Sequence, residues 1–88
     1  MHLEISITRQ CANCGEAFLI AERARTIAGL KVAVIHLDQP GQPIPPRVVA
    51  VPTYLLNGRV VSLGNPAREQ FLAMLRTARQ QQIEEAAR

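Results

Sequence analysis

The chain of 88 residues is 48% hydrophobic and 19% charged, the balance of an ordinary globular domain with one modest core. Its net charge of +3 is too small, and its cations are too scattered, to indicate nucleic-acid binding. No apolar run is long enough to cross a bilayer and no signal peptide is visible, so we expect a cytoplasmic protein without a membrane or nucleic-acid partner.

The first half of the chain predicts a strand, a helix and a second strand. Apolar and polar residues alternate over Leu3–Thr8, which is the period of a half-buried strand. Apolar residues recur every three or four positions over Glu16–Ala28, which predicts a helix that begins near Cys11 and stops at Gly29. Lys31–Leu37 is almost entirely apolar, which is typical of a parallel strand buried on both faces.

The second half begins with a loop and continues as a hairpin. Proline and glycine make up five of the nine residues of Asp38–Pro46 and exclude a regular helix there. Strands are expected over Thr53–Leu56 and Arg59–Ser62. Asn57 and Gly58 between them suit the positive φ angles of a type I′ turn.

A last helix should begin at Pro66, with Asn65 as its N-cap. The element order is therefore β-α-β-loop-β-β-α, an α/β fold (α+β under stricter schemes) with a four-stranded mixed sheet. We expect residues 1–82 to form the domain. Residues 83–88, which are polar or small, are expected to be a frayed tail.

Two cysteines, Cys11 and Cys14, stand at the junction of the first strand and helix. The unpaired N–H groups and the dipole of a helix N-terminus favour the thiolate form of Cys11. Cys14 lies one turn further on, so Cys11 could attack a substrate disulfide and Cys14 could resolve the mixed disulfide. A Cys-x-x-Cys within a βαβ pattern favours such redox chemistry over metal binding.

A metal-binding module is the first alternative. Zinc needs two further ligands, for which His2, His36 and Asp38 are the candidates, whereas the cysteines alone could hold Cu(I). His36 lies in an apolar strand, where a core or sheet histidine is the commoner finding. The sequence therefore predicts neither a metal site nor a cofactor.

The order and spacing of these motifs resemble the thioredoxin superfamily, and most closely its small glutaredoxin-like thioredoxins. A strand, Cys-x-x-Cys, a helix and a strand are followed by Val51-Pro52-Thr53, which opens the Asn57-Gly58 hairpin. The resemblance covers about residues 3–78. It implies a minimal thioredoxin fold in which the proline-rich loop replaces the second helix.

The resemblance also implies roles for single residues. Cys11 corresponds to the nucleophilic and Cys14 to the resolving cysteine of a dithiol–disulfide oxidoreductase. Pro52 corresponds to the cis-proline beside the cysteines, and Val51 before it offers backbone hydrogen bonds to an extended substrate segment. Gly64 corresponds to the glycine that keeps the backbone near the active site.

Two segments depart from the family pattern. Ala12 and Asn13, which are expected to face the substrate, stand where thioredoxins have Gly-Pro and glutaredoxins have Pro-Tyr. This dipeptide tunes the reduction potential. Glutaredoxins that bind glutathione usually have Gly-Gly followed by acidic residues, whereas in this chain the run NPAR follows Gly64.

The resemblance implies a protein or small-molecule disulfide as the substrate, and a reductase or glutathione as the electron donor. Without the second helix, one face of the sheet is left partly open, and we hypothesise that this face is a partner or homodimer surface. The same departures support a second alternative. In it, the chain is a specialised or inactive thioredoxin-like scaffold that acts mainly by binding a partner.

Overall fold

The computed structural model of the chain describes residues 1–9, 11–42 and 50–87. The elements follow the predicted order. They are β1 (His2–Ile7), α1 (Cys14–Ala24), β2 (Lys31–His36), β3 (Thr53–Leu56), β4 (Arg59–Leu63) and α2 (Arg68–Ala86). Most of the predicted proline-rich loop, residues 43–49, lies outside the described residues, and residues 37–42 before it form turns.

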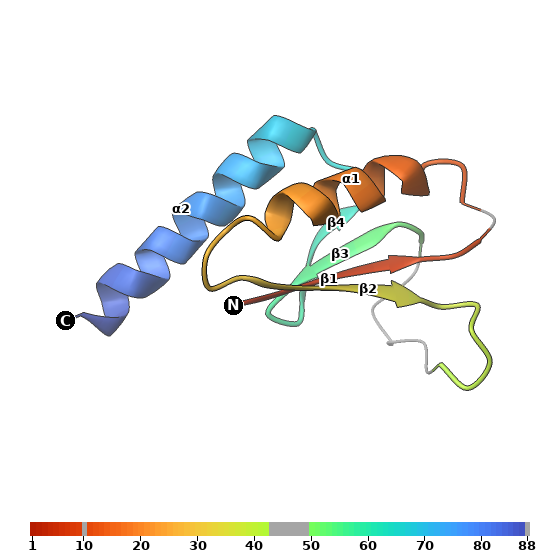
Figure 1. Cartoon of the computed structure of the whole chain (residues 1–88), viewed down its shortest axis with the longest axis horizontal. Coiled ribbons are helices and arrows are strands. Elements are labelled where there is room, and N and C mark those ends of the chain that lie inside the picture. Colours follow the sequence, from red (N-terminus) through yellow and green to blue (C-terminus); the bar gives the residue numbers. More distant parts are fainter. Residues whose placement is uncertain (10, 43–49, 88) are drawn as a thin grey trace.

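The four strands form one mixed sheet in the order β2-β1-β3-β4 (Figure 1). β1 pairs with β2 in parallel and with β3 antiparallel, and β3 and β4 form the predicted hairpin. Asn57 and Gly58 have φ angles of 51° and 83°, the positive values that the tight turn requires. The predicted α/β fold with its four-stranded mixed sheet is confirmed.

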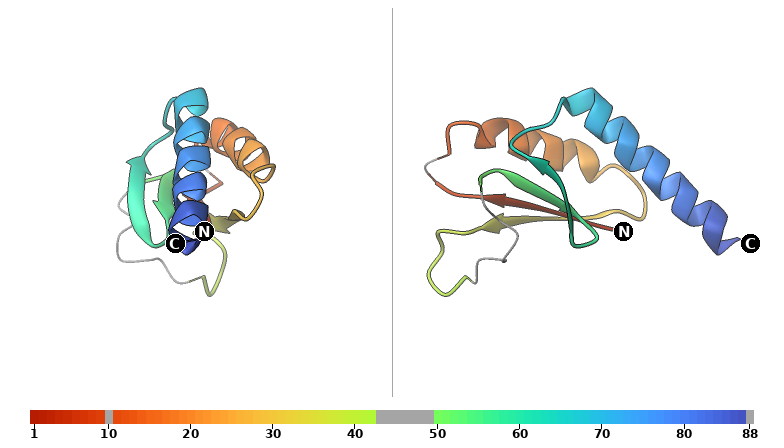
Figure 2. Two further views of the ribbon diagram at one scale, coloured as in Figure 1. Left: turned by 90° about the vertical axis from the view of Figure 1, so that its left-hand side faces the viewer. Right: turned by 180° about the vertical axis from the view of Figure 1, so that it is seen from behind.

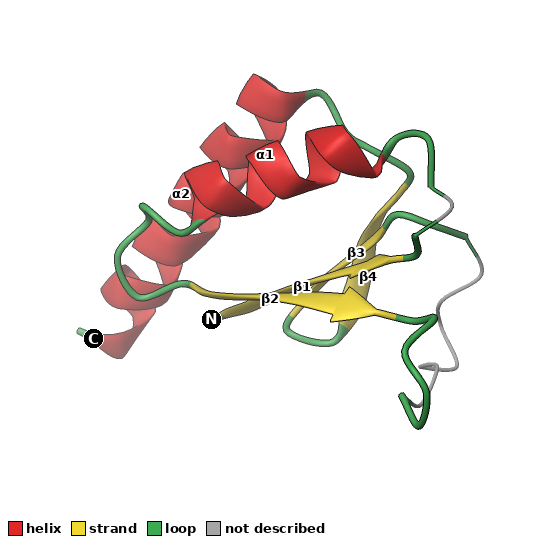
Figure 3. Cartoon of the chain, turned by 45° about the vertical axis from the view of Figure 1, so that its right-hand side comes forward, coloured by secondary structure: helices red, strands yellow, loops and turns green. Residues whose placement is uncertain are grey.

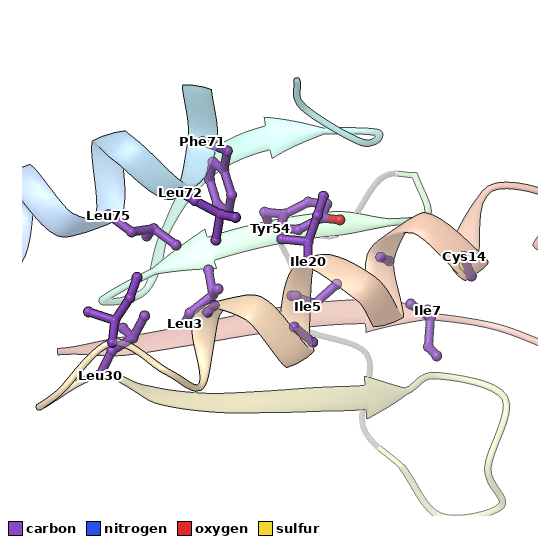
Figure 4. Packing of buried hydrophobic residues seen from close by; sticks show 14 residues of the cluster. Leu3, Ile5, Ile7, Cys14, Ile20, Leu30, Tyr54, Phe71, Leu72 and Leu75 are labelled. Atoms are coloured by element: carbon purple, nitrogen blue, oxygen red, sulfur yellow. The ribbon is translucent and has the colours of Figure 1, made fainter. Parts of the chain in front are cut away.

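Both helices pack on the same face of the sheet (Figure 3). The apolar residues of β1 point toward them, and Leu3, Ile5 and Ile7 are at most 2% exposed. The helices contribute one apolar stripe each, shown in part in Figure 4, made of Ala17, Ile20, Ala21 and Ala24 on α1 and Phe71, Leu72 and Leu75 on α2. Burial of each large apolar side chain contributes about 1.5–3 kcal/mol, so this layer is the main source of stability.

The prediction that β2 is buried on both faces is wrong. Lys31 and Ala33 are exposed, and the remaining residues of the strand are only half-buried. β2 is an edge strand that pairs with β1 alone, and α1 packs on one of its faces. An apolar composition by itself does not distinguish such an edge strand from a central one.

Helix α1 is shorter than predicted at both ends. It begins at Cys14 rather than near Cys11, and it ends at Ala24, before the predicted end. At the C-terminal end, the backbone N–H and the hydroxyl of Thr26 both donate to the carbonyl of Arg23, at 3.2 and 2.7 Å. These bonds span three residues and replace the α-helical pattern with a tighter turn.

Gly29 follows this turn, and replacing it with alanine is expected to destabilise the fold. Its φ is +80°, and a Cβ there would lie 2.3 Å from the guanidinium of Arg79, which donates to the carbonyl of Ala28 (3.0 Å). We expect Gly29→Ala to lower the free energy of unfolding by about 1–2 kcal/mol. Gly15→Ala, whose Cβ meets no atom within 4 Å, is the control and should not lower it. Equal urea midpoints for the two variants would contradict this prediction.

The sheet face opposite the helices is only partly uncovered. Ser6, Thr53 and Leu55 point to this face, yet they are 0%, 0% and 5% exposed. Their neighbours on β4, Val60 and Leu63, are 37% and 57% exposed. No helix of the described residues covers this face (Figure 3). A homodimer through it stays a prediction.

Helix α2 extends well beyond the sheet and gives the molecule its longest dimension of 43 Å (Figure 2). It remains helical to Ala86, and every described residue from Gln80 onward is exposed. The predicted domain boundary at residue 82 stays a prediction. In the described part of the chain, neither helix is long and apolar enough to traverse a bilayer.

Candidate redox site

Cys11 and Cys14 form a disulfide at the N-terminus of α1. Their Cα atoms lie 5.4 Å apart, within the usual range for this bond. Cys14 is the first residue of the helix, and its N–H donates to the carbonyl of Cys11 in the preceding turn (3.3 Å). The turn lies at the end of the sheet toward which β1 and β2 point (Figure 1). The sequence-predicted pair is thus brought together at a strand–helix junction.

The two cysteines differ in exposure. Cys14 is 5% exposed and belongs to the buried core (Figure 4), whereas Cys11 packs against that core and is partly exposed. Ala12 and Asn13 between them are exposed. Cys11 is therefore the more accessible end of the disulfide, and the dipeptide forms the surface beside it.

Val51, Pro52 and Gly64 form a second group at the same end of the sheet. The Val51–Pro52 peptide bond is cis, and the N–H of Gly64 donates to the carbonyl of Pro52 (2.7 Å). Thr53 is aligned with Ser6, so Pro52 lies at the end of the sheet from which the chain leaves β1 toward the cysteines. Gly64 has a φ of +86°, and a Cβ there would meet no atom within 4 Å. Its backbone conformation, rather than close packing, therefore favours glycine.

Asn65 joins the two groups, a role that the sequence reasoning missed. The prediction that it caps the last helix is wrong, because α2 begins at Arg68 with Ala67 as its N-cap. Its side-chain amide instead donates to the carbonyl of Asn13 (2.6 Å), and its Oδ1 accepts from the hydroxyl of Tyr54 (2.7 Å). Asn65 and Asn13 are 52 positions apart in sequence, so no local pattern could have signalled this contact.

A pocket of about 300 Å³ opens on the other side of the disulfide. It is lined by Ile7, Thr8, Arg9, Cys11, Cys14, Gly15, Phe18 and His36. Phe18 is 46% exposed, and its ring centroid lies 6.3 Å from that of His36. The pocket is thus lined by both cysteines, an exposed phenylalanine and two basic residues, and neither Pro52 nor Gly64 lines it.

Tyr54 lies behind the site, with its side chain in the core. Its ring is fully buried and meets Phe71 edge to face, with centroids 5.2 Å apart (Figure 4). Burial, and secondarily the charge of Glu16, raises the pKa of Tyr54 well above its usual 10.0. Glu16 itself accepts two hydrogen bonds from Arg68 (2.8 and 3.1 Å), which joins the first turns of α1 and α2.

The raised pKa of Tyr54 predicts how stability changes at alkaline pH. The folded state keeps the phenol proton to higher pH than the unfolded chain, so this contribution is complete below about pH 10 and is lost as the pH rises further. We expect the free energy of unfolding to fall as the pH rises from about 10 to about 12, and to fall less steeply in Tyr54→Phe. Urea titrations of both proteins across this range measure the slopes, and equal slopes would contradict the assignment.

The alternative metal ligands are dispersed. Among residues 1–9, 11–42 and 50–87, no three His, Cys, Asp or Glu side chains are grouped so that they could hold a metal ion. Asp38 accepts the backbone N–H of Arg9 (2.9 Å). His36 lies against Phe18 in the pocket. A multi-ligand zinc site within the described chain has no support from this arrangement.

Comparison with known proteins agrees with the geometry. The family model described as a thioredoxin domain matches residues 1–76, which include every element of the sheet, α1 and the start of α2. No curated protein matches the chain. With a cysteine pair at the start of α1 and this sheet order, the chain belongs to the thioredoxin-domain family.

Proposed function

We propose that the protein is a thiol–disulfide oxidoreductase in which Cys11 attacks the substrate and Cys14 resolves the intermediate. The observation that carries this assignment is the unequal exposure of the two cysteines. Cys14 is 5% exposed, while Cys11 is partly exposed and precedes the helix. An attacking sulfur must be reached by its substrate, whereas a resolving sulfur needs only to reach its neighbour.

The reduced protein acts in two exchange steps. The Cys11 thiolate attacks one sulfur of the substrate disulfide, which forms a mixed disulfide and releases the other sulfur as a thiolate that takes a proton from water. Cys14 then loses its proton and attacks the Cys11 sulfur, which releases the second substrate thiol. The substrate gains two electrons and the protein is left with the Cys11–Cys14 disulfide.

The substrate contacts follow from the surface around Cys11. Ala12 and Asn13 are exposed beside the attacking sulfur. Val51 is half-buried, and its backbone would pair with an extended segment of the substrate, next to Pro52 and Gly64. The substrate is therefore a protein or a small molecule whose disulfide can enter between these segments.

The cycle needs an external electron donor. The chain has two cysteines, both in the reacting pair, so no internal thiol can reduce the disulfide again. A dithiol of a reductase or the thiol of glutathione would supply the two electrons by the same exchange in reverse.

An equilibrium redox titration tests the proposal. Samples are equilibrated at defined potentials, alkylated, and weighed by mass spectrometry. We expect one reversible transition in which the protein gains two alkyl groups together. A midpoint of about −270 mV would mark a reductant and one of about −120 mV an oxidant.

Two outcomes would overturn the proposal. The first is failure to form the disulfide at any potential, and tight stoichiometric Cu(I) or Zn(II) binding would then favour the metal module. The second is a Cys11 that alkylates no faster than free cysteine at about pH 6, in a protein that binds partners but reduces no disulfide. That result would favour the inactive scaffold.

A further inference from the structure

A chain of hydrogen bonds runs from the core to the turn between the cysteines. It starts at the hydroxyl of Tyr54, whose ring is fully buried, and passes through the side chain of Asn65. It ends at the backbone carbonyl of Asn13, the residue that immediately precedes Cys14. The donor–acceptor distances are 2.7 and 2.6 Å.

Each hydrogen bond in this chain has only one possible direction. The carbonyl of Asn13 can only accept, so Asn65 must turn its NH₂ group toward it. That orientation leaves the Oδ1 of Asn65 facing Tyr54, which must therefore donate. Burial raises the pKa of Tyr54, so the phenol keeps the proton it needs for this role. The Asn13 carbonyl thus determines which end of the Asn65 amide meets the turn, and the buried phenol binds the other end.

The contact with Asn65 reaches a turn whose N-cap side chain makes no capping hydrogen bond. Asn13 is the N-cap residue of α1, but its own side chain makes no capping hydrogen bond. Its carbonyl oxygen carries partial negative charge and lies in the turn that joins the two sulfur atoms. Such an oxygen disfavours a thiolate nearby, and a donor bound to it reduces that repulsion.

We propose that Asn65 is a positioning residue for the dithiol, one that holds the Asn13 carbonyl and favours the thiolate form of Cys11. The inference rests on the proposed function, since it concerns the same cysteine pair. Asn65 acts through the turn and not on the substrate. Tyr54 supports it by donating a hydrogen bond to the Oδ1 of Asn65, which holds the amide in place.

The sharpest variant is Asn65→Asp. It has nearly the same shape and still accepts from Tyr54, but it offers no donor to Asn13 and adds a negative charge. We expect the pH midpoint for alkylation of Cys11 to rise by about one unit, which is a tenfold lower alkylation rate below the midpoint. Asn65→Ala removes the donor without adding charge and should give a smaller rise in the same direction.

Tyr54→Phe provides an independent test from the core side. It keeps the buried ring and removes only the hydroxyl, so the Asn65 amide loses the donor that holds its Oδ1 in place. We expect the pH midpoint for alkylation of Cys11 to rise by about as much as in Asn65→Ala. The double variant should show no larger rise than Asn65→Ala alone, because both changes interrupt one chain of contacts.

The experiment follows iodoacetamide alkylation of Cys11 against pH by mass spectrometry, in reduced protein carrying Cys14→Ser. Asn57→Asp, the same substitution in the β3–β4 turn at the other end of the sheet, controls for added charge, and circular dichroism checks folding. Asn65→Asp and Asn65→Ala profiles that coincide with that of the parent would overturn the proposal. If the Asn65 variants do not fold, an unshifted Tyr54→Phe profile would overturn it equally. The measurement needs no disulfide substrate, so a parent without reductase activity would count against the proposed function alone.

Discussion

Replacing Cys11 with serine is expected to abolish disulfide reduction, with a loss in kcat/KM of about three orders of magnitude or more. A serine hydroxyl stays protonated at neutral pH and cannot form the mixed disulfide. The reduction of a test disulfide, followed by thiol release, measures this loss. Ala73→Ser, an exposed position on α2, is the matched control and should retain activity.

Cys14→Ser is expected to behave differently, and the contrast identifies the attacking residue. Cys11 can still attack, but no second thiol releases the substrate, so the mixed disulfide should accumulate. Intact mass spectrometry would show the adduct in Cys14→Ser and not in Cys11→Ser. The reverse pattern would assign the attack to Cys14 and contradict the argument from exposure.

The largest effect on stability is expected from Leu75→Ala. Leu75 is fully buried on α2, where it packs against the sheet, and its truncation should lower the free energy of unfolding by about 2–5 kcal/mol. The free energy of unfolding of a domain of this size is about 5–15 kcal/mol in total, so the variant would be marginally stable. The urea midpoint should fall while the slope of the transition stays the same.

Met74→Ala is the matched control for this prediction. Met74 precedes Leu75 on the same helix, but it is 37% exposed. Its truncation removes a similar number of atoms from a site that water already reaches, so we expect a much smaller fall in the urea midpoint. Similar midpoints for the two variants would show that α2 does not depend on its buried stripe.

Features that depend on short-range pattern could be predicted from the sequence. The alternation along β1 determines which face meets the helices, because a one-residue shift would expose every apolar side chain. Asn57 and Gly58 are residue types that adopt positive φ readily, so the position of the hairpin turn could be read from these two neighbouring residues. The cysteine pair could be predicted because both cysteines and the helix N-terminus that carries them lie within a few residues of one another in the sequence.

Features that depend on distant partners could not be predicted. Asparagine is a residue type that often caps helices, which favoured that role for Asn65. Only the folded chain shows that its side-chain amide forms hydrogen bonds with Tyr54 and Asn13. The edge position of β2 depends on the order of strands, which local hydrophobicity does not encode. The pocket beside the disulfide likewise joins β1, α1 and the end of β2, which are separate in sequence.

The buried phenol of Tyr54 is also an intrinsic fluorophore of the protein. The chain has one tyrosine and no tryptophan, so the emission excited in the tyrosine absorption band comes from Tyr54 alone. That ring is two hydrogen bonds away from the turn that carries the disulfide. We therefore expect the emission of the unlabelled protein to differ between its disulfide and dithiol forms, so that no dye need be attached near the reacting thiols.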